Sequence, residues 1–258
     1  MYISQTNSTN TLLRDEFRDA PHLFTIRTDY QTSGRGQAGN GWESKRGQNL
    51  LFSTLLRPQR MEATLQFELS MAVSLALYRT IKGKMSTVNC PLSTIKWPND
   101  LYFGDRKLAG ILIENVLQGP YIERSIVGIG LNVNQTVFHA APNPVSMRLL
   151  TGKEYDLDEL LNTFLAQLQS ALTESSEFLR QAYLSVLYRR EGFFPYQERE
   201  VSVLPTNNIS AAEAKKENRP VFWAEIAGVS DVGELILRRQ DGSEKPYHYK
   251  QIRYVLES

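Results

Sequence analysis

The chain has 258 residues, of which 41% are hydrophobic and 22% are charged, and its formal net charge is +1 at pH 7. This length suits one large domain or a domain with a small appendage. The charge balance excludes a strongly basic nucleic-acid-binding face and a long disordered tail. No apolar run reaches the roughly 20 residues needed to cross a bilayer, and the polar N-terminus has no apolar signal segment.

Cysteine usage points to a reducing compartment. Cys90 is the only cysteine, so an intramolecular disulfide and a thiolate metal site are both excluded. We therefore expect a cytoplasmic protein that contacts no membrane.

The first part of the chain mixes helices and strands. Apolar residues at helical spacing predict a core-facing helix over 62–81, and a shorter helix is expected over 10–19 after good N-cap residues. Alternating and β-branched residues predict strands and a hairpin. The expected strands are 22–31, 48–56, 93–97 and 125–133, and the expected hairpin joins 101–103 to 107–116.

The second part contains two helices and then only short strands. A capping-box-like start at Asp156 and Glu159 predicts a helix to about residue 172, and another helix is expected over 176–190. After Gly192 we expect four strands, at 200–204, 221–229, 234–239 and 247–255. Short strands separated by turn residues are typical of a small antiparallel β-barrel.

A glycine-rich stretch, TSGRGQAGNG, places Gly34, Gly36 and Gly39 at G-x-G-x-x-G spacing. A dinucleotide-binding turn would need a helix after Gly39, but more glycines and then a strand follow, so this interpretation fails. A kinase glycine loop would need V-A-I-K, H-R-D and D-F-G motifs, and a P-loop would need G-x-x-x-x-G-K-[ST]; none occurs. Two interpretations of the stretch remain: a flexible surface loop, or a loop that becomes ordered over a bound anion. Arg35 between two glycines favours the second interpretation.

Other unusual strings lie at strand ends. Lys96-Trp97-Pro98-Asn99-Asp100 indicates either an edge strand ending in a turn or a phosphate and metal contact. Lys107 begins an apolar strand that contains Gly110. Either the aliphatic part of the Lys107 side chain lies along the surface with its ammonium in water, or the ammonium meets an anionic ligand. Asn132 lies at the end of a strand with two glycines. It could form hydrogen bonds to the edge of an adenine ring, or the glycines could simply allow tight packing of the sheet.

Common hydrolytic centres are absent. No G-x-S-x-G occurs, and the three histidines, His22, His139 and His248, stand in unrelated contexts. A serine–histidine hydrolase and a histidine-ligated metal centre are therefore disfavoured.

Taken together and in this order, these strings resemble the biotin protein ligases, also called biotin–[acetyl-CoA carboxylase] ligases. The resemblance runs from Ser8 to Asn134, and its motifs are specific only as a set. It implies an α/β (α+β) fold with a mixed β-sheet flanked by helices, like class II aminoacyl-tRNA synthetases, followed by an SH3-like β-barrel. The carrying residues are Ser8-Thr9-Asn10, Gln31, Gly34-Arg35-Gly36, Gly39, Trp42, Lys96 to Asp100, Lys107 to Leu112 and Gly128 to Asn132.

The resemblance implies two chemical steps. Biotin's carboxylate attacks the α-phosphate of ATP to give biotinyl-5′-AMP and pyrophosphate, and a carrier lysine then takes the biotinyl group. Lys107 and Arg35 would be the catalytic cations. Biotin would contact Ser8, Thr9, Asn10, Gln31, Gly34, Arg35, Gly36, Gln37, Lys107, Gly110 and Ile111. ATP would contact Trp42, Lys96, Asn99, Asp100 and Asn132, with Mg²⁺ on its phosphates near Asp100 and no protein-only metal site.

Two features depart from the family pattern. Family loops often read G-R-G-R-x-G, whereas Gln37 and Ala38 follow Gly36 here, so we expect a measurable off-rate for the adenylate. Some relatives carry an N-terminal winged helix-turn-helix and act as repressors. The Ser8 motif lies near the start of the chain, so we expect no such module and no DNA partner.

The expected domains are a biotin ligase catalytic domain over 1–192 and an SH3-like β-barrel over 193–258. The expected partners are biotin, ATP and a biotin carboxyl carrier protein of a carboxylase or decarboxylase, with the chain a monomer or homodimer. Two alternatives stay open. One is a lipoate (or other acyl) ligase of the same superfamily, and the other is a non-catalytic binding module whose barrel holds a peptide or RNA.

Overall fold

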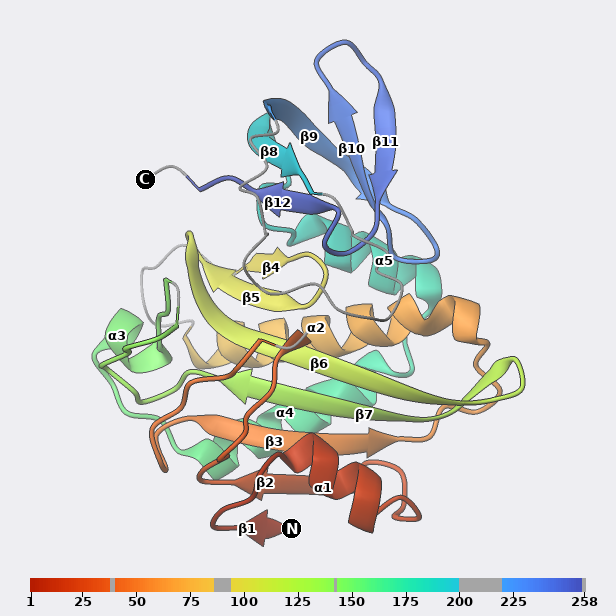
Figure 1. Cartoon of the computed structure of the whole chain (residues 1–258). Coiled ribbons are helices and arrows are strands. Elements are labelled where there is room, and N and C mark those ends of the chain that lie inside the picture. The colour runs from red at the N-terminus through yellow and green to blue at the C-terminus, as the bar shows by residue number, and fades with distance from the viewer. Residues whose placement is uncertain (38–39, 86–93, 142, 200–219, 257–258) are drawn as a thin grey trace, which may run out of the picture. The chain divides into compact units, whose positions relative to one another are not determined.

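A computed structural model describes the whole chain except residues 38–39, 86–93, 142, 200–219 and 257–258. It divides into two compact units, Met1–Tyr188 and Arg189–Ser258, each of which is described by itself (Figure 1). The expected boundary after residue 192 lies just inside the second unit. No helix among the described residues is long and apolar enough to cross a membrane.

The first unit is built on a mixed sheet, as expected. Its described strands number seven and lie in the order β1-β2-β3-β7-β6-β5-β4 (Figure 1). The β1–β2 pair is parallel, and every other neighbouring pair is antiparallel. The strands are β1 (Tyr2–Ile3), β2 (Thr25–Thr28), β3 (Leu50–Leu56), β4 (Thr94–Lys96), β5 (Asp100–Phe103), β6 (Arg106–Gln118) and β7 (Tyr121–Leu131).

Helices flank this sheet. Helices α2 and α4 cover one face, and α1 lies on the other (Figure 1). Apolar residues of α4 recur at spacings of three and four, and Phe164 among them packs edge-on against Phe52 of β3, with ring centroids 5.2 Å apart. The described helices are α1 (Thr9–Glu16), the 3₁₀ turn η2 (Ala63–Leu65), α2 (Gln66–Lys84), α3 (Met147–Thr151), α4 (Leu157–Ala171) and α5 (Ser176–Ser185).

The α1 face of the sheet carries a glycine pair that positions the site. Leu13 of α1 packs on Ile126 of β7, and because side chains alternate along a strand, Gly128 and Gly130 point to the same face. Gly110 of β6 lies directly opposite Gly130. Two facing glycines leave this part of the sheet without side chains, so another group can lie directly on the backbone.

The second unit is a single antiparallel sheet in its described part. The order is β11-β10-β9-β8-β12, and the predicted closure into an SH3-like barrel stays a prediction. Its strands are β8 (Phe194–Glu198), β9 (Val221–Val229), β10 (Leu235–Arg239), β11 (Glu244–Tyr247) and β12 (Ile252–Tyr254).

Several predicted boundaries were wrong. The strand expected over 247–255 is two strands, because Lys250 has a positive φ and Gln251 closes a turn onto His248. The strand β2 is shorter than the expected 22–31, since Leu23 has φ 65°. β1, α3 and β8 were not predicted. The strand expected at 200–204 lies outside the described residues.

Candidate active site

The start of α1 forms one end of the site. Thr9 donates to the Gln31 side-chain oxygen from its backbone N–H (2.8 Å) and its hydroxyl (3.1 Å). The Ser53 hydroxyl of β3 lies within hydrogen-bond distance of two acceptors, Thr9 Oγ1 (2.7 Å) and Asn10 Oδ1 (2.5 Å). Ser8, the N-cap residue, is also buried. The structure thus brings the predicted residues Ser8, Thr9, Asn10 and Gln31 together over the sheet.

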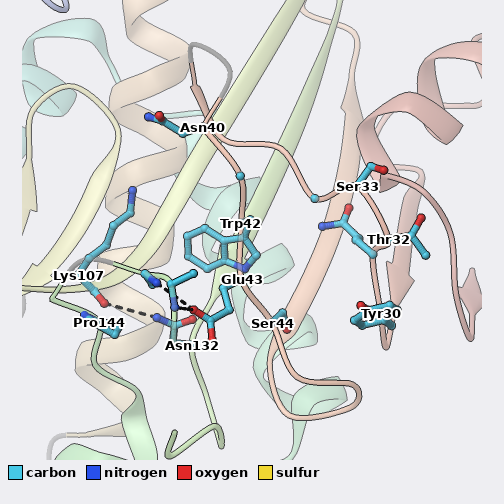
Figure 2. A pocket seen from close by; sticks show the side chains of 15 residues that line it. Tyr30, Thr32, Ser33, Asn40, Trp42, Glu43, Ser44, Lys107, Asn132 and Pro144 are labelled. Atoms are coloured by element: carbon cyan, nitrogen blue, oxygen red, sulfur yellow. Dashed lines mark hydrogen bonds between the residues drawn. The ribbon is translucent and has the colours of Figure 1, made fainter. Parts of the chain in front are cut away.

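The indole of Trp42 occupies the glycine pair. A Cβ atom added to Gly130 would lie 2.7 Å from Trp42 Cζ2 and Nε1, and one added to Gly110 would lie 3.1 Å from Cζ3. Real Cβ atoms essentially never come as close as the Gly130 distances, so glycine is required there, and the Gly110 distance is tighter than most real Cβ contacts. Figure 2 shows the ring between Lys107 on one side and Thr32 and Ser33 on the other. Trp42 therefore lies where a ligand on this part of the sheet would have to go.

Lys107 stands beside the glycine pair. Its Nζ is 2.8 Å from Asp100 Oδ1 and 5.8 Å from the centroid of the Trp42 ring. Its stem passes over Gly110, since a Cβ there would lie 3.4 Å from Lys107 Cε. Both side chains of the ion pair are partly exposed, at 30% and 23%. An ammonium held in this way can exchange its carboxylate partner for a ligand anion at modest cost.

Arg35 has a different carboxylate partner. Its guanidinium donates to Thr11 Oγ1 at 3.0 Å and lies 3.5 Å from Glu114 Oε1, and Asn10 donates to the second oxygen of Glu114 at 2.7 Å. Glu114 is four residues beyond Gly110 on the same face of β6, so roughly 13 Å of strand separates the two ion pairs. In this structure Arg35 and Lys107, both predicted to be catalytic, do not meet.

The loop around Arg35 is held by backbone bonds. Gly34 accepts from the Trp42 N–H at 3.0 Å, and Gly36 donates to the Asn40 carbonyl at 2.6 Å. The Oε1 atom of Gln37 is buried without a partner among the described residues. Gly39, the third glycine of the motif, lies outside the described residues, as does Cys90.

A cavity of about 690 Å³ lies against Trp42, Lys107 and Asn132 (Figure 2). This volume is in the usual range for small-molecule sites. Asn132 is buried and donates weakly to the Lys107 carbonyl (3.4 Å). Its Oδ1 and the Nε1 of Trp42 have no hydrogen-bond partner in the part of the chain that the structure describes. Both residues line the cavity, and because these two atoms are themselves buried, a planar ligand with complementary polar edges would reach them only when the Trp42 ring moves.

Three predicted residues make contacts elsewhere. Lys96 donates to the Tyr102 hydroxyl at 3.1 Å and lies over that ring, and burial raises the pKa of Tyr102. The side-chain amide of Asn99 donates to the Ile111 carbonyl, and the Ile111 N–H donates to the Asn99 carbonyl at 3.0 Å. Ile111 is itself buried in the core. Asn99 and Ile111 thus link β5 to β6, and neither they nor Lys96 line the cavity.

Sequence reasoning missed four polar residues that organise the site. Glu114 holds Arg35 and Asn10, and Ser53 holds Thr9 and Asn10. A serine inside the apolar run of β3 and a glutamate inside β6 were the available signals. The other two are Glu43, which bonds to the 139–141 backbone, and Thr11, which accepts from Arg35.

The described residues contain no group of three or more His, Cys, Asp or Glu side chains that could hold a metal ion. Asp100 is the carboxylate paired with Lys107 at the glycine pair. A divalent cation at this point would therefore need ligands from a bound substrate, as Mg²⁺ commonly does.

Comparison with known proteins agrees with this geometry. A profile of the biotin/lipoate A/B protein ligase family matches residues 2–132. The biotin–[acetyl-CoA-carboxylase] ligase of Paracoccus denitrificans is 30% identical over 254 residues, covering 94% of this chain and 95% of that protein. The bifunctional ligase/repressor BirA of Escherichia coli (strain K12) is 30% identical over 248 residues, covering 93% of this chain and 69% of that protein.

A solved structure shares the fold. The biotin protein ligase from Aquifex aeolicus, in complex with biotin and ATP, superposes with a TM-score of 0.76 at 22% identity, covering 99% of this chain and 98% of that one. The family match includes the start of α1, the glycine loop, the Lys107 strand and Asn132. The chain therefore belongs to the biotin/lipoate A/B protein ligase family.

Proposed function

We propose that this protein is an ATP-dependent biotin protein ligase, which activates biotin as biotinyl-5′-AMP and transfers it to a lysine of a carrier protein. One observation carries the proposal within the family. A side-chain-free strip of sheet at Gly110 and Gly130 is flanked by the Lys107 ammonium and by a cavity with an unpaired donor and acceptor. Such a strip can take a flat, uncharged ring system. An anionic group attached to that ring would then lie toward the lysine.

In the first step, a biotin carboxylate oxygen forms a bond to the α-phosphorus of ATP. The bond from that phosphorus to the bridging oxygen of the β-phosphate breaks, and pyrophosphate leaves. Both reactants are anions, so cations must offset the negative charge in the transition state. Lys107 would do so once it exchanges Asp100 for the substrates, and Arg35 would join it after leaving Glu114.

The positions of the predicted biotin-binding residues support their proposed roles. Thr9, Asn10 and Gln31 form a hydrogen-bonded group beside Ser8 that suits the polar head of biotin. Gly110 would let the ring lie against the sheet, and the Ile111 backbone supports it from within β6. The loop residues Gly34, Arg35, Gly36 and Gln37 would close over the carboxylate and adenylate.

The nucleotide-binding roles centre on the cavity. Trp42 would stack against the adenine, and its ring would move off Gly130 when biotin enters. Asn132 would offer its free Oδ1 to the amino group of the base. Lys96 and Asn99, which bond to Tyr102 and Ile111 outside the cavity, would have to exchange these partners to contact the phosphates, and Asp100 would contact them through Mg²⁺. Mg²⁺ would come with ATP and neutralise phosphate charge, and Asp100 is the proposed protein contact.

In the second step, the neutral ε-amine of the carrier lysine attacks the acyl carbon of biotinyl-5′-AMP. The acyl carbon–oxygen bond to the phosphate breaks, AMP leaves, and the nitrogen loses a proton as the amide forms. A biotin-dependent carboxylase is the proposed source of the carrier, in line with the Paracoccus relative. The cytoplasmic location, the lack of a DNA partner and the monomer or homodimer state stay predictions.

Biotin-dependent exchange of labelled pyrophosphate into ATP tests the first step, and an avidin blot of a carrier domain tests the second. We expect exchange with biotin and a labelled carrier. Exchange with lipoate instead of biotin would favour a lipoate ligase. Exchange with neither acid would favour a non-catalytic binding module and overturn the proposal.

A further inference from the structure

Glu43, the residue after Trp42, is bound by three consecutive backbone N–H groups. Its Oε1 accepts from His139 at 2.8 Å, and its Oε2 accepts from Ala140 at 2.7 Å and Ala141 at 2.9 Å. Figure 2 shows the Glu43 carboxylate with dashed bonds among the residues that line the cavity. Three successive N–H groups that converge on one carboxylate form an anion-binding nest.

The carboxylate is anionic in this setting. Burial of the carboxyl acts to raise its pKa, but the bonds from the Ala140, His139 and Ala141 N–H groups outweigh it, and the pKa of Glu43 is lowered. Bonds from N–H groups to a charged acceptor are stronger than neutral ones. Glu43 is therefore a firm attachment between two loops that lie far apart in sequence.

The attached segment reaches the Lys107 side of the site. Lys107 donates its N–H to the Asn143 carbonyl at 2.7 Å, and Val145 donates to the Lys107 carbonyl at 2.9 Å. Between these two attachments, Ala140, Ala141 and Pro144 line the cavity. The described residues 139–141 and 143–145 thus form a cavity wall, which Glu43 holds at one end and Lys107 at the other.

A second, buried link lies behind this wall and does not depend on Glu43. Asn49 donates to the Gln135 side chain at 2.6 Å and accepts from the Val133 N–H at 3.0 Å. Lys45 also donates its N–H to Gln135, at 2.8 Å. Both Asn49 and Gln135 are buried. Because this link keeps the two loops adjacent, loss of Glu43 should loosen the cavity wall without unfolding the unit.

We propose that Glu43 is a positioning residue for nucleotide binding. It fixes the distance between Trp42 and the described wall residues Ala140 and Ala141, and so sets the width of the slot that receives the base. It acts through Trp42 and the wall backbone rather than by contact with the reacting atoms. The inference rests on the proposed function, since it assigns this cavity to ATP.

Glu43→Gln is the direct test, because it keeps the shape but replaces one acceptor oxygen with an NH₂ group that opposes an N–H. In pyrophosphate exchange we expect the KM for ATP to rise about tenfold, which corresponds to roughly one lost charge-assisted bond, while the KM for biotin changes by less than about twofold. Glu43→Asp keeps the charge on a shorter stem and should restore part of the ATP affinity. Limited proteolysis within 136–141 should be faster in Glu43→Gln.

Asp156→Asn is the matched control. Asp156 also accepts from two backbone N–H groups, those of Asp158 and Glu159, but it caps α4 and does not line the cavity. The Asp156→Asn variant should have a lower melting temperature, but its KM for ATP should not rise relative to its KM for biotin. Equal rises in both KM values for Glu43→Gln, or an unchanged KM for ATP, would overturn the role of Glu43. Wild-type protein without any biotin-dependent exchange would instead overturn the proposed function, and with it this inference.

Discussion

The indole of Trp42 lies on Gly130, and no side chain larger than hydrogen fits between them. A Cβ on Gly130 would come within 2.7 Å of three ring atoms. Gly110 supports the same ring from the neighbouring strand. The position of the ring therefore explains why glycine occurs at Gly110 of β6 and Gly130 of β7. A substitution at either glycine would disturb the site without changing its charged residues.

Gly130→Ala should displace Trp42 and reduce activity more than stability. The ring belongs to a loop and can move, so the unfolding free energy should fall by no more than about 1–2 kcal/mol. The KM for biotin in pyrophosphate exchange should rise by about tenfold or more. Gly228→Ala is the control, because a Cβ there meets no atom within 4 Å. A Gly130→Ala enzyme with unchanged KM would refute the role of the glycine pair.

Biotin binding should change the fluorescence of Trp42. Its ring now lies against the sheet with Nε1 buried, and a ligand on the glycine strip must move it. Titration with biotin should therefore shift the emission, and Trp42→Phe should abolish the shift. The other tryptophans, Trp97 and Trp223, report background changes. A shift that survives in Trp42→Phe would show that the ring does not respond to biotin.

Lys107→Gln should reduce adenylation strongly. Removing one preorganised cation or donor at a reacting oxyanion typically costs about 10²–10³ in rate, so the kcat for pyrophosphate exchange should fall about 100-fold. Lys84→Gln is a suitable control, since Lys84 pairs with Glu159 on the helices and does not line the cavity. Near-normal kcat in Lys107→Gln would remove Lys107 from the chemistry.

Glu198 should make the second unit acid-sensitive. Bonds from the Tyr247 hydroxyl (2.7 Å) and Lys245 (2.9 Å) lower the pKa of Glu198 below its ordinary value of 4.5. A lowered folded-state pKa gives stability that is present above pH 4.5 and is lost as the pH falls through the folded value. Burial, together with the bond to the same carboxylate, raises the pKa of Tyr247 to about 12.

The corresponding test is Glu198→Gln in urea denaturation at pH 7, 5 and 4. The variant should be about 1 kcal/mol less stable at pH 7 and should lose less stability than wild type on acidification. Glu244→Gln, which breaks an exposed pair with Arg238, should change little. Parallel pH curves for wild type and Glu198→Gln would contradict the assignment.

Local sequence signals were enough for many elements, and they also gave the prediction of the site residues. The Asp156 cap and the periodic leucines predicted α4, and the apolar period predicted α2. The strings at Ser8, Gly34, Lys107 and Asn132 predicted which residues would gather, and the family match includes all four. These signals are readable because caps, turns and periodicity involve residues only a few positions apart.

Only the tertiary structure decided how those residues face one another. Strand register pairs Gly110 with Gly130 and so makes room for Trp42, and a one-residue slip would turn both glycines to the other face. Chain folding also brings Glu43 to the 139–141 backbone and separates Arg35 from Lys107 through different carboxylates. Such contacts join residues far apart in sequence, and they depend on packing and desolvation that no short stretch of sequence encodes.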